Sequence, residues 1–98
     1  MKRVRQSSHA EADIVAAIKY LRQKSPEAAI GFVTALELAI KRIARFPELA
    51  PMQWRSKRSE LVNARCSVIR RFGYLIYYNN AVDSVLILRI VHGSQNEP

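Results

Sequence analysis

The sequence predicts an α+β domain in which a hairpin of two N-terminal helices packs on a small antiparallel β-sheet. Apolar residues recur at helical spacing in the first half of the chain, and change to strand-like runs rich in Val, Ile, Leu and Tyr after about residue 61. Helices that precede strands, rather than alternating with them, are typical of this class. The 98 residues, 49% of them hydrophobic, fit one domain over residues 1–98 with one modest core.

The first element is predicted to be a short edge strand at residues 2–6, where basic residues alternate with Val4. Lys and Arg on an edge strand discourage aggregation. The next residues, Ser8-His9-Ala10-Glu11, have the spacing of a capping box, so a helix is predicted to begin at Ser8. Its buried stripe is expected to include Ile14, Ile18 and Leu21.

A second helix is predicted from Ser25-Pro26-Glu27. Proline disfavours helix in the residue before it but suits the first helical position, and Ser25 can supply the cap. The two helices should therefore form a hairpin. Phe46-Pro47 ends the second helix, whose broad apolar face is expected to be core and comprises Ala29, Phe32, Val33, Leu36, Ile40 and Ile43.

A polar, proline-containing connector over residues 47–61 is predicted to be a loop. Strand patterns follow at residues 62–71, 74–78 and 85–91. The segments between them contain the Gly, Asn and Asp that are typical of hairpin connections, so an antiparallel meander is expected.

The charge of the chain indicates an anionic partner. Sixteen Lys and Arg against eight Asp and Glu give a net charge of +8, which attracts polyanions or an acidic protein, although basic charge can also serve solubility alone. Trp54 in the connector suits a contact patch or, equally, packing over the end of the second helix. The basic residues that cluster after it are Arg55, Lys57, Arg58, Arg65, Arg70 and Arg71.

Other classes of protein and site are not expected. The sequence shows neither a signal peptide nor an apolar run of the roughly 18 residues that span a bilayer, so a cytoplasmic protein without a membrane partner is predicted. Cys66 is the only cysteine and the two histidines lie far apart. We therefore expect no disulfide, no metal and no cofactor.

Several segments, in this order, resemble the ParE/RelE superfamily, the toxins of bacterial type II toxin–antitoxin systems. They are Ala12-Asp13-Ile14, Ser25-Pro26-Glu27-Ala28-Ala29, Ala44-Arg45-Phe46-Pro47-Glu48-Leu49-Ala50-Pro51, Val62-Asn63-Ala64-Arg65, Gly73-Tyr74-Leu75-Ile76-Tyr77-Tyr78 and Ile87-Leu88-Arg89-Ile90-Val91-His92-Gly93-Ser94. The resemblance covers nearly the whole chain. It implies a helical hairpin on a small sheet and a cognate acidic antitoxin that wraps the toxin. A homodimer and a toxin–antitoxin hetero-oligomer both stay open.

Two branches of the superfamily imply different activities. Members similar to RelE cut messenger RNA on the ribosome, whereas members similar to ParE poison DNA gyrase. Metal-independent cleavage requires a base, cations that stabilise the transition state, and an acid. The RelE branch commonly has basic residues on two neighbouring strands, at positions where this sequence has Leu75, Cys66 and Val68.

The remaining candidates for endoribonuclease chemistry are Arg65, Arg89 and His92. His92 is either a strand-end histidine that hydrogen-bonds the backbone or a proton-transfer group. Arg89 is either a structural arginine, with Arg65 or the chain terminus involved, or the centre of a site. The strand tyrosines either pack in the core or stack on bases: Tyr74, Tyr77 and Tyr78.

The resemblance and the missing cations favour a ParE-like toxin that inhibits DNA gyrase and arrests growth. The alternatives are a ribosome-dependent endoribonuclease and a non-toxic member that binds the antitoxin or regulates the operon. The residues predicted to contact the target or the antitoxin are Trp54, Arg55, Lys57, Arg58, Arg65, Arg70 and Arg71.

Overall fold

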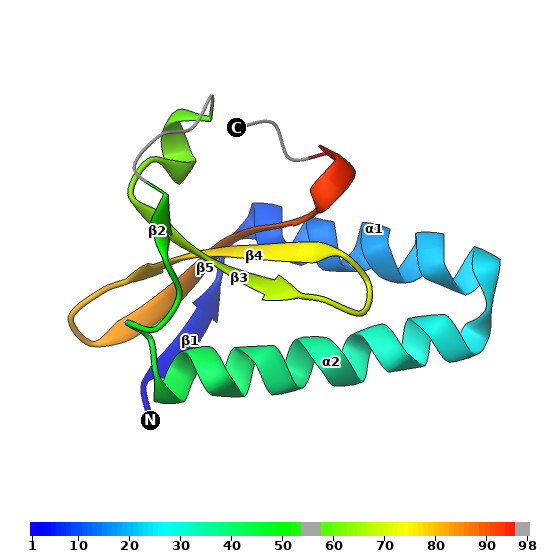
Figure 1. Ribbon diagram of the computed structural model, residues 1–98, viewed down its shortest axis with the longest axis horizontal. Helices are drawn as coiled ribbons and strands as arrows, with labels where there is room; N and C mark the ends of the chain where they lie inside the picture. Colours follow the sequence, from blue (N-terminus) through cyan, green and yellow to red (C-terminus); the bar gives the residue numbers. More distant parts are fainter. Residues whose placement is uncertain (54–57, 96–98) are drawn as a thin grey trace.

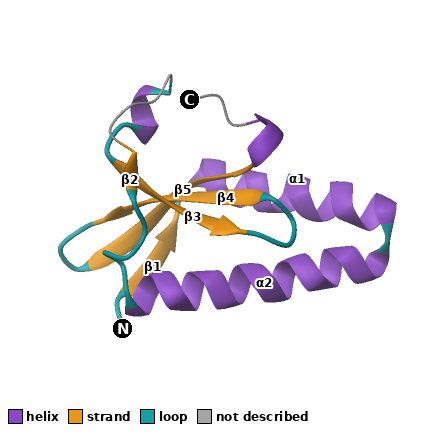
Figure 2. Cartoon of the chain, in the orientation of Figure 1, coloured by secondary structure: helices purple, strands orange, loops and turns teal. Residues whose placement is uncertain are grey.

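The computed structural model describes residues 1–53 and 58–95, and it forms two layers, a helical hairpin on one face of a twisted sheet (Figures 1 and 2). The α+β class predicted from the sequence is thus confirmed. Short 3₁₀ turns lie at Ser59–Leu61 and Gly93–Gln95. The main elements are β1 (Arg3–Gln6), α1 (Ser8–Lys24), α2 (Pro26–Arg45), β2 (Met52–Gln53), β3 (Ala64–Ile69), β4 (Tyr74–Asn80) and β5 (Ser84–His92).

The sheet has the strand order β1-β5-β4-β3-β2. Strands β3, β4 and β5 form the predicted antiparallel meander. The predicted edge strand β1 is also present, but it pairs with β5 in parallel, with Val4 opposite Val85, so the sheet is mixed rather than wholly antiparallel. The reason is topological: two helices separate β1 from the meander, and such a long connection does not impose the antiparallel direction that a hairpin does.

Helix α1 begins at Ser8 as predicted, but its N-cap is Ser7. The Ser7 hydroxyl accepts the backbone N–H of Ala10 at 3.0 Å, which makes Ser8 the first helical residue and excludes the capping box centred on Ser8. Pairing with the sheet makes Ser7 the cap. The backbone N–H of Ser7 donates to the carbonyl of Ile87 at 2.9 Å, and this bond keeps Ser7 in the extended conformation that an N-cap requires.

Helix α2 begins as predicted, with the Ser25 hydroxyl accepting the N–H of Ala28 at 2.9 Å. Its buried face includes Phe32, Leu36 and Ile43. The Phe32 ring lies 4.9 Å from the Tyr74 ring, centroid to centroid, and joins the helices to the sheet. No helix in the described part of the chain is long and apolar enough to cross a membrane.

The connector contains more structure than the predicted loop. It includes β2 and the 3₁₀ turn that ends at Leu61, and the Leu61 side chain is only 1% exposed. Leu61 belongs to a second apolar cluster, which lies on the sheet face away from the helices and also contains Ala64, Cys66, Tyr77 and Val91. Residues 55–60, directly before Leu61, are all polar, and this gave too weak a pattern to predict the packing of Leu61. Trp54, Arg55 and Lys57 lie outside the described residues.

Burial makes the stability of this fold sensitive to alkaline pH. Removal from water raises the pKa of Cys66, of Tyr74 and of Tyr78, although the positive charge of Arg65 acts in the opposite direction at Tyr78. The folded chain therefore holds these protons more tightly than the unfolded chain does. The resulting stability is fully present below the ordinary pKa values, 9.0 for Cys and 10.0 for Tyr, and is lost as pH rises through the folded values.

We expect the free energy of unfolding, measured by urea denaturation, to fall steadily above about pH 9. Tyr78→Phe should reduce this slope. It should also lower stability by about 1 kcal/mol at neutral pH, because the Tyr78 hydroxyl donates to the carbonyl of Pro47 at 2.9 Å. A stability that stays constant between about pH 8 and about pH 11 would contradict the burial argument.

Candidate functional site

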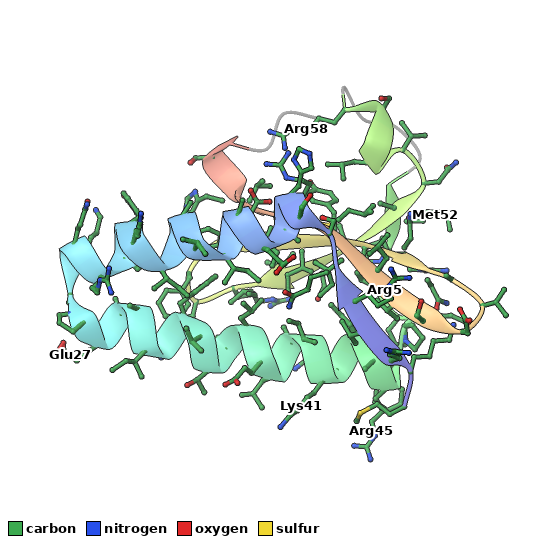
Figure 3. All side chains as sticks on the ribbon, turned by 180° about the vertical axis from the view of Figure 1, so that it is seen from behind. Arg5, Glu27, Lys41, Arg45, Met52 and Arg58 are labelled. Atoms are coloured by element: carbon green, nitrogen blue, oxygen red, sulfur yellow. The ribbon has the colours of Figure 1, made fainter. Side chains whose placement is uncertain are left out.

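A cleft of about 690 Å³ lies between α1 and the end of β5. Its apolar surface comes from Ala16 and Ala17 on α1 and from Ile90 and Val91 on β5. Arg58, from the connector, also lines the cleft, and Figure 3 draws it above the first turns of α1. A concave site with several polar groups is the first candidate for function, and its other lining residues are Asp13, Tyr20, Tyr74, Arg89, His92 and Ser94.

Asp13 and Arg89 form a two-pronged ion pair across the cleft. The Arg89 Nε donates to Asp13 Oδ2 at 2.7 Å, and Nη2 donates to Oδ1 at 3.1 Å. The same Oδ2 accepts the backbone N–H of Ile90 at 2.9 Å. Both side chains are largely shielded, with 22% of Arg89 and 15% of Asp13 exposed. Arg89 is therefore a paired arginine whose charge is balanced within the fold.

The local fold explains why an aspartate is needed there. Strand β1 ends with Gln6 opposite Ile87, whereas β5 continues to His92, and no strand of residues 1–53 and 58–95 pairs with that part of β5 on the β1 side. Atoms of the α1 end take the place of the missing strand: the Ser7 hydroxyl donates to the carbonyl of Leu88 at 2.8 Å, and Asp13 accepts from Ile90. This closes an edge that would otherwise expose unpaired backbone groups.

The His92 ring is held by hydrogen bonds to Ser94 and by packing against Tyr74. Its Nδ1 accepts the backbone N–H of Ser94 at 3.1 Å and lies 2.8 Å from the Ser94 hydroxyl. The neutral ring therefore carries its proton on Nε2. The ring packs edge-on against Tyr74, with centroids 5.2 Å apart. In this state His92 can donate a hydrogen bond from Nε2, but neither nitrogen is ready to accept a proton from a 2′-hydroxyl.

Gly73 is needed beside this ring. Its backbone has a φ of +71°, and a Cβ there would approach His92 Nε2 to 3.2 Å. Both the turn between β3 and β4 and the close approach of the imidazole therefore favour glycine.

Arg65 lies away from the cleft. Strand β4 separates its strand, β3, from β5. Its Nη1 donates to the carbonyls of Glu48 at 3.1 Å and Ala50 at 2.8 Å, which holds the connector after α2. The structure thus brings Arg89 and His92 together but not Arg65. The chain terminus, the other partner considered for Arg89, lies outside the described residues.

The described residues that were predicted to contact a partner do not form one patch. Arg58 lines the cleft, while Arg70 and Arg71 are exposed just beyond β3. The Arg71 guanidinium carbon lies 5.0 Å from the centroid of the Phe72 ring. That these residues contact the target or the antitoxin stays a prediction.

The aromatic residues differ in how far they are exposed. Tyr74, Tyr77 and Tyr78 are 7%, 2% and 0% exposed, so all three pack in the core and present no stacking platform. Tyr74 also lines the cleft, but the aromatic side chain that is exposed there is Tyr20, at 52%. Sequence reasoning missed both Tyr20 and Asp13. Their spacing on one face of α1, with Ala16 and Ala17 between them, was the signal that could have found them.

Within the described ranges, no group of three or more His, Cys, Asp and Glu side chains is placed to hold a metal ion.

Comparison with known proteins gives a consistent result. A family model described as the ParE toxin of the type II toxin–antitoxin system parDE matches residues 4–97. A solved structure, the chromosomal ParDE toxin–antitoxin system from P. aeruginosa, is similar with a TM-score of 0.73 and 19% identity. The match covers 94% of this chain and 96% of that one, and it shows a shared fold. A search of curated proteins found no match.

Replacing Asp13 should weaken the fold. Asp13→Ala removes the acceptor of the Arg89 guanidinium and of the Ile90 N–H, and hydrogen bonds to charged groups contribute about 1.5–3 kcal/mol each. We expect the free energy of unfolding to fall by about 2–3 kcal/mol in urea denaturation. Glu37→Ala, which removes an exposed carboxylate from α2, is the control and should change it by less than about 0.5 kcal/mol. Equal, small effects of the two substitutions would contradict the role given to Asp13.

Proposed function

Since the chain belongs to the ParE toxin family of type II toxin–antitoxin systems, we propose that it arrests growth by inhibiting DNA gyrase and that a cognate acidic antitoxin neutralises it. The inhibition is by binding and includes no cleavage of RNA.

The observation that carries this proposal is the state of Arg89 and His92 in a cleft whose lining also includes Arg58, together with the position of Arg65 away from it. Stabilising a phosphorane-like transition state needs cations whose charge is available to the phosphate. The guanidinium of Arg89 is balanced by Asp13, and Arg65 holds the connector on the far side of β4. His92 already accepts a backbone N–H at Nδ1. These contacts support a site that maintains the fold over a site that breaks a phosphodiester.

The charge of the molecule supports anionic partners. A net charge of +8 on 98 residues accelerates association with acidic proteins and with DNA-bound enzymes, and it does so less at high salt. Arg70 and Arg71 are exposed and so are available to such a partner.

A supercoiling assay with purified gyrase and relaxed plasmid tests the proposal directly. We expect the toxin to inhibit supercoiling, and we expect His92→Gln to inhibit within about tenfold of the parent, because a proton-transfer residue would lose about 10²–10⁴-fold. Primer extension on translated messages should show no new cuts. Growth arrest with cuts and without gyrase inhibition would identify the endoribonuclease alternative. No growth arrest at all would identify a non-toxic regulatory member.

A further inference from the structure

Helix α2 packs one side on the core and runs along the border of the molecule (Figure 1). In its second half, Leu38, Arg42 and Phe46 follow one another at intervals of four residues, and side chains with this spacing form one ridge along a helix. Leu38 is 62% exposed, and Phe46, the C-cap residue, is 51% exposed. Two large apolar side chains on this ridge therefore face solvent and not the core.

The turn after α2 extends this exposed surface. Leu49 is 73% exposed, and its backbone N–H donates to the carbonyl of Phe46 at 3.2 Å. A hollow of about 310 Å³ opens at this turn, and it is lined by Arg45, Phe46, Pro47, Glu48 and Leu49. Hollows between exposed apolar side chains receive the anchor residues of partner proteins. We name Leu38, Arg42, Arg45, Phe46 and Leu49 together the α2 ridge.

Hydrogen bonds from the rest of the fold hold this turn in one conformation. The hydroxyl of the buried Tyr78 donates to the carbonyl of Pro47 at 2.9 Å. The Arg65 guanidinium donates to the carbonyls of Glu48 at 3.1 Å and Ala50 at 2.8 Å. A partner that binds a turn already fixed in this way loses little conformational entropy. The exposed apolar side chains are thus presented by a rigid support.

The backbone of α2 indicates that a folded surface binds here. An extended segment binds by pairing its main chain with a sheet edge, whereas the main-chain groups inside a helix are already paired with one another. The side chains of α2 are therefore the groups that a partner can contact. Figure 3 shows two of them, Lys41 and Arg45, pointing away from the sheet.

Charge selects the kind of folded surface. Arg42 and Arg45 are exposed in the last turn of α2, and Lys41 is exposed beside them. Glu37 and Glu48 are the acids nearest to them in sequence, so the bases are in excess. Apolar side chains beside exposed bases fit a partner surface on which carboxylates surround an apolar group. A second copy of this chain would instead bring another net charge of +8, which opposes association.

We propose that the α2 ridge docks on an acidic surface of a folded protein, the target that the toxin inhibits. An apolar side chain of the target enters the hollow beside Leu49, and carboxylates of the target contact Arg42 and Arg45. This rests on the proposed function in one respect, because DNA gyrase is the target expected there.

Two variants of the ridge have matched controls elsewhere in the chain. Leu49→Ser removes an exposed apolar side chain from a turn, and Val82→Ser does the same in the turn between β4 and β5, where Val82 is 97% exposed. Arg45→Glu reverses a charge in the last turn of α2. Arg22→Glu reverses one in the last turn of α1 and changes the net charge by the same amount. Urea denaturation verifies that each variant folds, and Leu38→Ser replaces a ridge variant that does not.

The readouts are growth arrest on expression without antitoxin and the half-inhibitory concentration in the supercoiling assay with purified gyrase. We expect Leu49→Ser and Arg45→Glu to raise that concentration by at least about tenfold and to abolish growth arrest. We expect Val82→Ser and Arg22→Glu to stay within about threefold of the parent and to arrest growth, because neither side chain belongs to the ridge.

The two readouts separate this surface from the proposed target. Inhibition of gyrase by all four variants at the parent concentration would overturn the ridge and leave the target in place. Growth arrest that the ridge variants lose and the controls keep, with gyrase active throughout, would support the ridge and refute gyrase as the target. A parent that neither arrests growth nor inhibits gyrase refutes both.

Three other occupants of the ridge give different results, and each result would overturn the proposal. Loss of inhibition with Arg45→Glu but not with Leu49→Ser would identify a nucleic-acid contact, which needs the charge alone. A parent that sediments as a dimer and a Leu49→Ser variant that sediments as a monomer with full inhibition would identify a second copy. Ridge variants that arrest growth but are not rescued by the co-expressed cognate antitoxin would identify the antitoxin.

Discussion

The carboxylate of Asp13 satisfies both a guanidinium and a backbone N–H at the point where β5 extends past its neighbour β1. The arrangement of the molecule depends on this contact, because α1 follows β1 after one residue and has to pack on the same sheet. Ser7 and Asp13 fix where the helix begins and how it lies against β5. The walls of the cleft, from Asp13 to Tyr20 on one side and Arg89 to His92 on the other, follow from that position.

The same contact bears on function. A basic residue in a cleft attracts a catalytic interpretation, yet the geometry around Arg89 is that of a closed hydrogen-bonded group whose charge is already balanced. His92 is similarly committed to the backbone of Ser94. The cleft therefore supports binding more readily than chemistry. This agrees with membership of a toxin family and with a surface charge suited to anionic partners.

Local signals in the sequence predicted the helices and the meander, because caps, proline positions and hydrophobic period act over a few residues. Ser25-Pro26 and Gly73 are examples. The rest depends on contacts between distant residues. Asp13 and Arg89 are 76 positions apart, so the helical spacing of Asp13 could place it on a face of α1 but could not predict its pairing with Arg89, and the sequence identified Arg89 and His92 as candidates but not the aspartate beside them. The parallel pairing of β1, the choice of Ser7 as cap, and the burial of Leu61 are set in the same way by the folded sheet.

A double-mutant cycle on Asp13 and Arg89 tests the central claim most directly. The free energies of unfolding of the parent, of each single alanine variant and of the double variant give the coupling energy between the two side chains. If the pair holds α1 to the sheet, the coupling should be about 1–3 kcal/mol in the stabilising direction. A coupling near zero would show that the two side chains act independently, and would contradict an account in which their contact sets the position of the helix.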